Sequence, residues 1–256
     1  KLLDQINRFN KLLKPIFKNQ VFFLKKNFIE NFGFSKQHIQ SLIHCPFEGQ
    51  INTGKTIYSL QNKVKELGGT LYTNTNVDKI ITRGKRNRVI VKNNQNEIHF
   101  ESKFLAICTN AFAKKWFPKE DINPGRGMVL ITKPIKNLKI KGCFHYDKGF
   151  NYFRNINERI MIGGGRNIDF RKEETTQHGI NSKIKKKLIN DLEDFIIPNQ
   201  KFEIDMEWSG IMAFGKTKMP IVKSVSEGVA IGVRIGGMGM AIGSIVGKKT
   251  YEHLNT

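Results

Sequence analysis

A glycine-rich turn near the C-terminus holds the residues best suited to contact a ligand. Gly236-Gly-Met-Gly239 follows an apolar, β-branched stretch, Val229 to Ile235, that predicts a buried strand, and it precedes Met240 to Leu254, which predicts a helix. The N-terminus of that helix would direct free N–H groups and partial positive charge at the turn, where glycine lets a flat or anionic ligand approach the backbone. We expect a ligand there; the alternative is a strand-to-helix turn that binds nothing.

The turn differs from the dinucleotide fingerprint of a Rossmann unit. That fingerprint needs a second strand after the helix and an acidic residue about 20 positions on. The sequence ends at Thr256, so we expect the turn to belong to the last strand–helix unit of a fold whose first unit lies elsewhere.

A second candidate phosphate site satisfies the pattern G-x-x-x-x-G-K-[ST] at Gly49–Thr56, and a predicted helix, Thr56–Leu67, follows it. In a P-loop protein Lys55 would reach the terminal phosphates and Thr56 would hold Mg²⁺. The preceding segment is a poor buried strand, because Pro46 removes a ladder donor and Glu48 is charged. We interpret the match as accidental and keep a P-loop NTPase as an alternative.

The chain is strongly basic, with a formal net charge of +21. Such a charge occurs in proteins that bind nucleic acids or anionic membranes. The densest basic clusters, Arg83–Arg88 and Lys183–Lys187, lie in a hairpin-like stretch and on a predicted helix, and the other basic residues are scattered. Because Asn and Ile are abundant as well, a compositional bias also explains the charge. We expect no nucleic-acid partner, and a basic nucleic-acid-binding protein stays an alternative.

Length and cysteine content bound the class of protein. The 256 residues, 39% of them hydrophobic, suffice for one large or two modest domains with real cores. The sequence starts at Lys1 without a secretory or transit signature, which suggests a fragment, and no apolar run is long enough to cross a bilayer. Three widely spaced cysteines, Cys45, Cys108 and Cys143, argue against a disulfide framework or a zinc site. We expect a cytoplasmic protein without a metal.

The elements that must position these residues mix helix and strand patterns. Residues 1–44 are helical in pattern, with a boundary at Pro15 and a short helix capped by Ser35. Asn123–Gly127 breaks the later pattern, and we place a domain crossing near it. Further strands are predicted at 71–81, 88–92, 97–100, 104–110, 128–132, 149–154, 159–163 and 203–208, and a helix at 181–195. The mixture is typical of two interleaved domains.

Four segments, in this order, resemble the FAD-dependent oxidoreductases of the D-amino acid oxidase, glycine oxidase and sarcosine oxidase type. They resemble the family's helix and adenine-contacting strand, its strand returning to the cofactor, its substrate-domain strands and its closing segment. The four are residues 49–77; Leu105–Ala111 with Trp116–Pro118; Pro124–Leu130 with Tyr152–Arg154 and Ile162–Gly165; and Trp208–Met212 with Met219–Val222 and Gly236–Gly239.

The resemblance implies an α/β (α+β) fold in which a Rossmann-like FAD/NAD(P)-binding domain is interleaved with a β-rich substrate domain. It implies a helical segment of the substrate domain at 1–47, the middle of the FAD-binding domain at 48–120, the β-rich substrate domain at 121–207 and the closing part of the FAD-binding domain at 208–256. The family's opening GxGxxG unit, with its N-terminal βαβ, is expected to be missing.

The resemblance also implies a cofactor site for non-covalent FAD. The backbone of Val77 would contact adenine, and the final glycine turn would lie beside the pyrimidine edge of the flavin. Arg234 would add charge there or, alternatively, form a structural ion pair. The implied cofactor-binding residues are Val77, Cys108, Thr109, Asn110, Arg234, Gly236, Gly237, Met238, Gly239 and Met240.

The reaction implied is oxidation of a carbon–nitrogen bond, with hydride transfer to flavin N5 and with oxygen or an electron carrier as acceptor. Tyr152 and Arg154 lie two apart on a predicted strand, so they share a face and could clamp a carboxylate. The family's amino-acid oxidases commonly carry an arginine where Met212–Phe214 stand here, which favours an amine or a modified amino acid as substrate. The catalytic residues are not assigned, and a non-catalytic remnant of the flavoprotein fold is a further alternative.

Overall fold

The computed structural model describes residues 1–84, 86–93 and 96–254, and it divides into two compact units. The first unit comprises Lys1–Ile51, Gly127–Glu173 and His178–Gly210. The second comprises Asn52–Arg126, Glu174–Gln177 and Ile211–Thr256. The chain therefore passes between the units several times, so each unit is assembled from segments far apart in the sequence.

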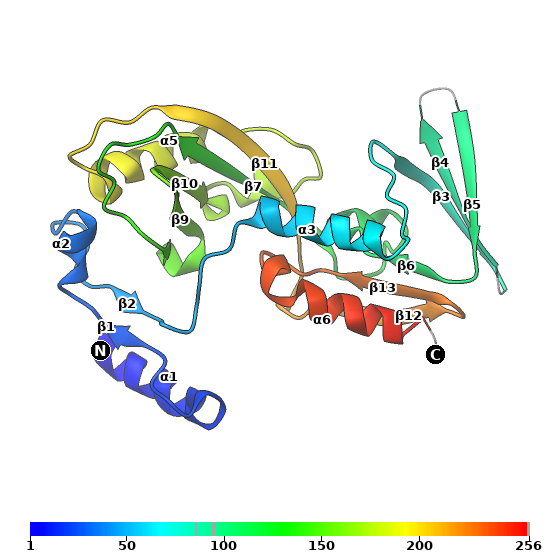
Figure 1. The fold of residues 1–256 in the computed structure, drawn as a ribbon, viewed down its shortest axis with the longest axis horizontal. Coiled ribbons are helices and arrows are strands. Elements are labelled where there is room, and N and C mark those ends of the chain that lie inside the picture. The colour runs from blue at the N-terminus through cyan, green and yellow to red at the C-terminus, as the bar shows by residue number, and fades with distance from the viewer. Residues whose placement is uncertain (85, 94–95, 255–256) are drawn as a thin grey trace. The chain divides into compact units, whose positions relative to one another are not determined.

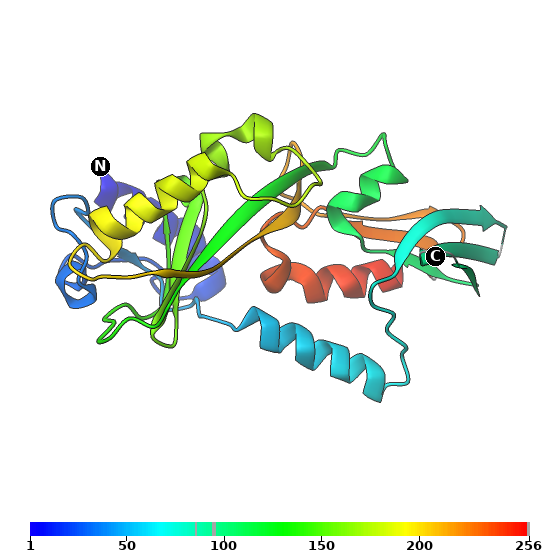
Figure 2. The same cartoon turned by 90° about the horizontal axis from the view of Figure 1, so that it is seen from above.

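A five-stranded sheet with the order β11-β7-β10-β9-β8 organises the first unit (Figures 1 and 2). Alternate residues of these strands point into a core that they share with helix α5, which lies along one face of the sheet. Met128, Leu130 and Ile162 of the sheet and Leu188 of α5 are almost fully buried there. The strands are β7 (Asn123–Thr132), β8 (Cys143–Tyr146), β9 (Asn151–Ile156), β10 (Arg159–Gly164) and β11 (Ile204–Phe214), and α5 is Ser182–Asp191.

Helix α5 begins where the predicted helix begins because Asn181 caps it. The Asn181 carboxamide oxygen accepts hydrogen bonds from the Lys183 and Ile184 N–H groups, and its nitrogen donates to the buried Glu173 carboxylate at 2.8 Å. A π-helical turn, Leu192–Ile196, continues α5. The short elements of this region are the 3₁₀ turns Asp147–Gly149 and Arg166–Ile168 and helix α4, Phe170–Glu173.

The N-terminal part of the first unit consists of helix α1 (Leu2–Phe17), strand β1 (Phe23–Leu24), helix α2 (Phe28–Phe32) and strand β2 (Ile43–His44). Strands β1 and β2 pair antiparallel, and Phe34 joins the core of the larger sheet through edge contacts with Phe144 and Phe153.

The second unit contains two three-stranded sheets. In the order β12-β13-β6, β13 is wholly buried and runs parallel to β6, whereas β12 pairs with β13 antiparallel. Strands β3, β4 and β5 form an antiparallel meander. The elements are α3 (Thr53–Glu66), β3 (Asn76–Arg83), β4 (Arg86–Asn93), β5 (Asn96–Ser102), β6 (Leu105–Ile107), the 3₁₀ turn Asn110–Lys115, β12 (Ile221–Ser226), β13 (Val229–Val233) and α6 (Gly239–Glu252).

Helix α6 packs onto β13 through a glycine. A Cβ at Gly232 would lie 2.1 Å from the Thr250 hydroxyl oxygen and 3.3 Å from a Val246 methyl, so only glycine allows this approach. Val246 and Thr250 are the buried residues of α6. This contact fixes the direction of α6 and therefore the position of its N-terminus at the glycine turn.

Several predicted elements are confirmed and three are wrong. The hairpins at 88–100 and 149–163 and the final strand, turn and helix are present. The boundary expected at Pro15 is wrong, because α1 accommodates Pro15 in its last turn and ends at Phe17, with Lys18, whose φ is 56°, as its C-cap. The expected helix after Ser35 is only a turn, in which the Ser35 hydroxyl meets His38 Nδ1 at 3.1 Å. The strand expected from Leu71 begins five residues later, at Asn76.

Candidate flavin site

The glycine turn of the second unit is built by two left-handed residues. Arg234 has φ 60° and Gly236 has φ 57°, so the chain leaves β13 and reverses direction within a few residues. The Gly236 N–H donates to the Ala213 carbonyl at 3.0 Å, and Met238 N–H donates to the Ile235 carbonyl at 3.0 Å. The turn is thereby tied to β11 and delivers the chain directly into helix α6 at Gly239.

Three N–H groups at this turn have no acceptor within the described part of the chain: those of Gly237, Gly239 and Met240. Met238, the N-cap residue of α6, supplies no side-chain cap, and Gly237 and Met240 are exposed. Unsatisfied donors at a helix N-terminus attract negative charge. The turn therefore has the donor set that an anionic or carbonyl-bearing ring edge requires, as the sequence predicts.

The backbone beside these donors is little covered by side chains at Gly237 and more tightly bounded at Gly239. A Cβ at Gly237 would make only ordinary contact, 3.8 Å from the Met212 sulfur, whereas a Cβ at Gly239 would lie 3.1 Å from Ile235 Cδ1. Met212, predicted to bind substrate, thus lies next to the glycine turn in the second unit. A planar ligand can approach the backbone here because glycine leaves no side chain above it.

Arg234 is held by other protein groups. Its Nη1 donates to the Asp121 main-chain oxygen at 3.0 Å and to the Asp121 carboxylate at 2.7 Å, its Nε donates to the Met219 carbonyl, and its Nη2 donates to the Thr217 hydroxyl. The side chain is only 11% exposed. The structural ion pair, given above as the alternative role of Arg234, is therefore present.

The carboxyl ends of the parallel strands β6 and β13 meet at one edge of their sheet, where Cys108, Thr109 and Asn110 follow β6. The Asn110 side-chain oxygen accepts a hydrogen bond from the Ile235 N–H at 3.2 Å, which joins this edge to the glycine turn. Partial burial raises the pKa of the Cys108 thiol, opposed by a contact with the Gly232 backbone, so the thiol is neutral at pH 7. Thr109 is exposed.

Val77, predicted to contact adenine, lies on β3 opposite Val91, next to an irregularity in the strand pairing at Val77/Lys79. Val77 is half-buried. Among the described residues no hydrogen bond links Val77 to the glycine turn, and its role stays a prediction.

The first unit carries polar side chains together on one face of its sheet. Tyr152 and Arg154 alternate with the buried Phe153 on β9 and so share one face, as predicted, and His145 lies opposite Tyr152 on β8 with ring centroids 6.2 Å apart. Tyr152 lies across Gly163 of β10: a Cβ there would be 2.7 Å from the Tyr152 hydroxyl oxygen. That hydroxyl makes no hydrogen bond with any described residue. Burial raises the pKa of Tyr152, and the charge of Arg154 opposes the shift.

Part of the Arg154 guanidinium is already hydrogen-bonded within the protein. One guanidinium Nη1–H group donates to the Ile51 carbonyl oxygen, and Nε is buried without a partner. The free hydroxyl of Tyr152 is therefore the better-placed donor of the predicted pair.

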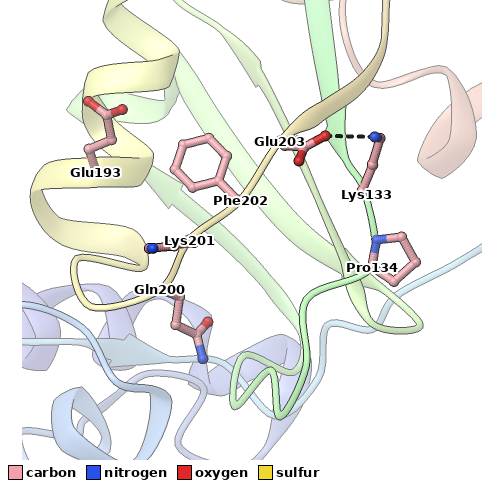
Figure 3. A pocket seen from close by; sticks show the side chains of 7 residues that line it. All are labelled: Lys133, Pro134, Glu193, Gln200, Lys201, Phe202 and Glu203. Atoms are coloured by element: carbon pink, nitrogen blue, oxygen red, sulfur yellow. Dashed lines mark hydrogen bonds and ion pairs between the residues drawn. The ribbon is translucent and has the colours of Figure 1, made fainter.

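A hollow of about 600 Å³ lies elsewhere in the first unit (Figure 3). An ion pair between Lys133 and Glu203, 2.6 Å apart, borders it. The hydrogen bond from Lys133 lowers the pKa of Glu203, and the same bond raises the pKa of Lys133. Both side chains are mostly exposed, and none of the predicted site residues lines the hollow, so it is a solvated surface feature. Its lining residues are Lys133, Pro134, Glu193, Gln200, Lys201, Phe202 and Glu203.

The segment with the P-loop pattern, Gly49–Thr56, lacks the buried parallel strand that a P-loop follows. The preceding strand, β2, has two exposed residues and pairs antiparallel with β1. Asn52 caps helix α3 by accepting from Lys55 N–H at 3.0 Å, so Lys55 and Thr56 lie in the first turn of an ordinary capped helix. The pattern is therefore accidental, as interpreted.

Neither a metal site nor a membrane span is present among the described residues. They contain no group of three or more His, Cys, Asp or Glu side chains able to hold a metal. None of their helices combines the length and the apolar character needed to cross a bilayer.

Three residues important to these sites were missed in the sequence: Asp121, which holds Arg234; Gly163, which makes room for Tyr152; and His145, which faces Tyr152. The alternation of Cys143-Phe-His-Tyr146 is a strand signal that could have placed His145 on the face of Tyr152. Asp121 carried no local signal, because its partner is 113 positions away.

Comparison with known proteins gives the fold and the family. The chain is similar to L-proline dehydrogenase from P. horikoshii (18% identity, TM-score 0.75, covering 97% of this chain and 68% of that one). It is also similar to glycine oxidase from Geobacillus kaustophilus (14% identity, TM-score 0.78, covering 98% of this chain and 67% of that one). A third similar structure is iminodiacetate oxidase from Chelativorans sp. BNC1 (14% identity, TM-score 0.73, covering 98% of this chain and 68% of that one).

This chain thus spans about two thirds of the length of those structures. No curated protein matches its sequence. Residues 19–253 match the family described as DAO: FAD dependent oxidoreductase. The match covers most of the chain, which therefore belongs to the DAO family of FAD-dependent oxidoreductases.

Proposed function

We propose that this protein oxidises the carbon–nitrogen bond of an amine or amino acid, with FAD as its non-covalently held cofactor. The family supports the cofactor and the reaction type. The names of three similar structures, L-proline dehydrogenase, glycine oxidase and iminodiacetate oxidase, support the substrate class, because each names a small compound with a carbon–nitrogen bond next to a carboxylate.

The observation that carries the proposal is the set of three unpaired N–H groups at Gly237, Gly239 and Met240. Bound FAD supplies the acceptor for the hydride that leaves the carbon next to nitrogen. The three donors would hold the carbonyl-bearing edge of its ring and stabilise the negative charge that reduction leaves there. Gly236 and Met238 would maintain the turn, and Asn110 would hold its position through Ile235.

On the substrate side, Tyr152 would donate its hydroxyl hydrogen to a polar group of the substrate. Its neighbour Arg154 would add positive charge, with part of its guanidinium already held by Ile51. Met212, next to the glycine turn of the second unit, would contribute an apolar surface to substrate binding at the position where the family's amino-acid oxidases carry an arginine. This donor set suits a substrate held by one or two hydrogen bonds, such as a secondary amine or a modified amino acid, better than one needing a bidentate arginine clamp. The electron acceptor would be oxygen or an electron carrier.

The first test is FAD binding, measured by the quenching of flavin fluorescence and by the visible spectrum of the purified chain. We expect saturable binding. Bleaching of the flavin under anaerobic conditions on addition of L-proline, glycine or iminodiacetate, or of simple secondary amines, would then identify the substrate class. A chain that binds FAD but is not bleached by any compound containing a carbon–nitrogen bond would contradict the substrate proposal. If the chain does not bind FAD, the result would favour the alternative that it is a non-catalytic remnant of the flavoprotein fold.

Tyr152→Phe separates substrate binding from cofactor binding. We expect the substrate KM to rise on the order of tenfold, because one hydrogen bond is lost, while FAD affinity stays unchanged. Tyr58→Phe is the matched control, since Tyr58 is an exposed tyrosine on α3. Equal effects of the two substitutions would remove Tyr152 from the substrate site.

A further inference from the structure

Helix α1 exposes a stripe of apolar side chains formed by Leu2, Phe9, Leu12 and Ile16. Three of these residues are seven positions apart and Leu12 lies between two of them, so they share one side of the helix. All are exposed, Leu12 to 62% and Ile16 to 74%. Ile6 is the buried residue of α1. We call this set the α1 stripe.

The α1 stripe is held outward by contacts on another side of the helix. Asn10 accepts hydrogen bonds from the Val21 and Phe22 N–H groups at 3.0 and 2.8 Å, and its own amide donates to the Phe22 carbonyl at 2.9 Å. The Phe17 ring lies 5.1 Å from the Phe47 ring. Helix α1 is thereby fixed beside β1 (Figure 1), so turning the stripe inward would break these contacts.

Positive charge is concentrated around the α1 stripe. Residues 1–28 contain seven Lys or Arg and one acidic residue, Asp4, a net charge of +6 in about one ninth of a chain whose total is +21. The basic residues are Lys1, Arg8, Lys11, Lys14, Lys18, Lys25 and Lys26. Arg8, Lys11, Lys14 and Lys18 are exposed and form no ion pair with any described residue.

From this combination we infer that α1 docks in the plane of an anionic lipid surface, with the α1 stripe entering the headgroup layer. A helix with an exposed apolar side, Phe and Leu on that side and Lys and Arg on the polar side has the composition of interfacial membrane helices. The surplus of unpaired positive charge selects an anionic bilayer over a neutral protein groove, because clustered basic residues gain attraction from acidic headgroups. The inference is independent of the proposed reaction.

Helix α3 provides the contrast within the same molecule. Ile57, Leu60, Val64 and Leu67 form a stripe of exposed apolar residues there too, and α3 has no buried residue. Its Lys63, however, pairs with Glu66 at 3.0 Å, which leaves two unpaired lysines on α3 against three unpaired cations on α1 among the described residues. The further basic residues that surround the α1 stripe in residues 1–28 have no counterpart in α3. The apolar stripe of α3, with less positive charge around it, therefore serves as the control for nonspecific hydrophobic binding.

The test is flotation of the intact 256-residue chain with vesicles. We expect binding to vesicles of phosphatidylcholine and phosphatidylglycerol in equal amounts on the order of tenfold stronger than to pure phosphatidylcholine, and weaker binding as salt is added. The double variant Leu12→Gln/Ile16→Gln should lose at least about tenfold of this binding. Lys11→Glu/Lys14→Glu should remove the preference for the anionic vesicles and leave the weak binding to neutral ones.

The matched control is Ile57→Gln/Leu60→Gln, which makes the same type of change on α3 and should leave vesicle binding unchanged. Thermal melting of all variants checks that they fold. The inference is overturned if the chain does not float, if it floats equally with neutral vesicles, or if the α3 control loses as much binding as the α1 variant. It is also overturned if light scattering shows a dimer that the α1 variant converts to a monomer without any vesicle binding, because the occupant would then be a second copy.

Discussion

Arg234 and Asp121 are joined by two hydrogen bonds from one guanidinium nitrogen, to the main-chain oxygen at 3.0 Å and to the carboxylate at 2.7 Å, although they are 113 positions apart in the sequence. The same carboxylate accepts a hydrogen bond from the Lys216 N–H at 2.7 Å. Asp121 therefore links the segment before β7, the loop after β11 and the end of β13. Because Arg234 is the first residue of the glycine turn, this link sets where the turn begins.

Asp121→Ala should destabilise the protein by about 1–3 kcal/mol, because it removes the counter-ion of the almost buried Arg234 guanidinium and the acceptor of the Lys216 N–H. Urea unfolding measures the change. Glu101→Ala is the matched control: its ion pair with Arg88 is about half exposed on both sides, so its loss should cost clearly less than the loss of Asp121. Similar costs for both variants would show that the Asp121 link does not support the turn.

Gly237→Val tests the cofactor surface without disturbing the fold. A Cβ at position 237 makes ordinary contact with Met212, so the melting temperature should change little, whereas the added side chain should obstruct a ring lying on the turn. We expect FAD affinity to fall by at least about tenfold, as measured by fluorescence titration. The control is Gly247→Val, farther along α6, where a Cβ meets nothing within 4 Å. Unchanged FAD affinity in Gly237→Val would place the cofactor elsewhere.

Local patterns predicted the strand, turn and helix of the glycine site because each depends on neighbours in the sequence: a β-branched run, glycines, then a stretch without breakers. The alternation that puts Tyr152 and Arg154 on one face is equally local and was confirmed. The partners of the arginines were not predictable. Ile51 lies 103 positions from Arg154 and Asp121 lies 113 positions from Arg234, and such pairs arise only when the whole chain folds.

At Pro15 and Ser35, by contrast, a local sequence pattern predicts the end or the start of a helix that the structure does not have there. Pro15 stands in the last turn of α1, and the helix continues through it to end two residues later at Phe17, with the left-handed Lys18 as its C-cap. After Ser35 the chain makes a single turn, in which the His38 and Ile39 N–H groups donate to the Ser35 carbonyl, and the Ser35 N–H donates to the distant Phe195 carbonyl at 3.0 Å.

Tyr146 should make stability fall at high pH. Burial, and then a hydrogen bond to the Asp191 carboxylate at 2.6 Å, raise the pKa of Tyr146 above its ordinary value of 10.0. A raised pKa in the folded state means that the contribution is fully present below the unfolded pKa and is lost as pH rises above it. Above about pH 10 the unfolded chain binds fewer protons, so stability should fall by up to about 1.4 kcal/mol per pH unit from this group.

Urea unfolding between about pH 8 and pH 11 would measure that slope. Tyr146→Phe should reduce the slope, and Tyr58→Phe, at an exposed position, should leave it unchanged. If the slope of Tyr146→Phe equals that of the parent protein, the ionisation of Tyr146 does not limit stability at high pH.

Gly163→Ala tests how the position of Tyr152 is set. A Cβ at position 163 would lie 2.7 Å from the Tyr152 hydroxyl oxygen and 2.9 Å from the Met128 carbonyl oxygen, so the tyrosine ring or strand β7 must shift. We expect a loss of stability of about 1–3 kcal/mol and a ring displaced from the sheet. In the background of Tyr152→Ala, which removes the whole ring, including the hydroxyl oxygen and Cζ at 2.8 Å, the same substitution should cost less, because only the Met128 contact remains. A double-mutant cycle of unfolding free energies measures the difference, and additive costs would show that Gly163 and Tyr152 do not constrain each other.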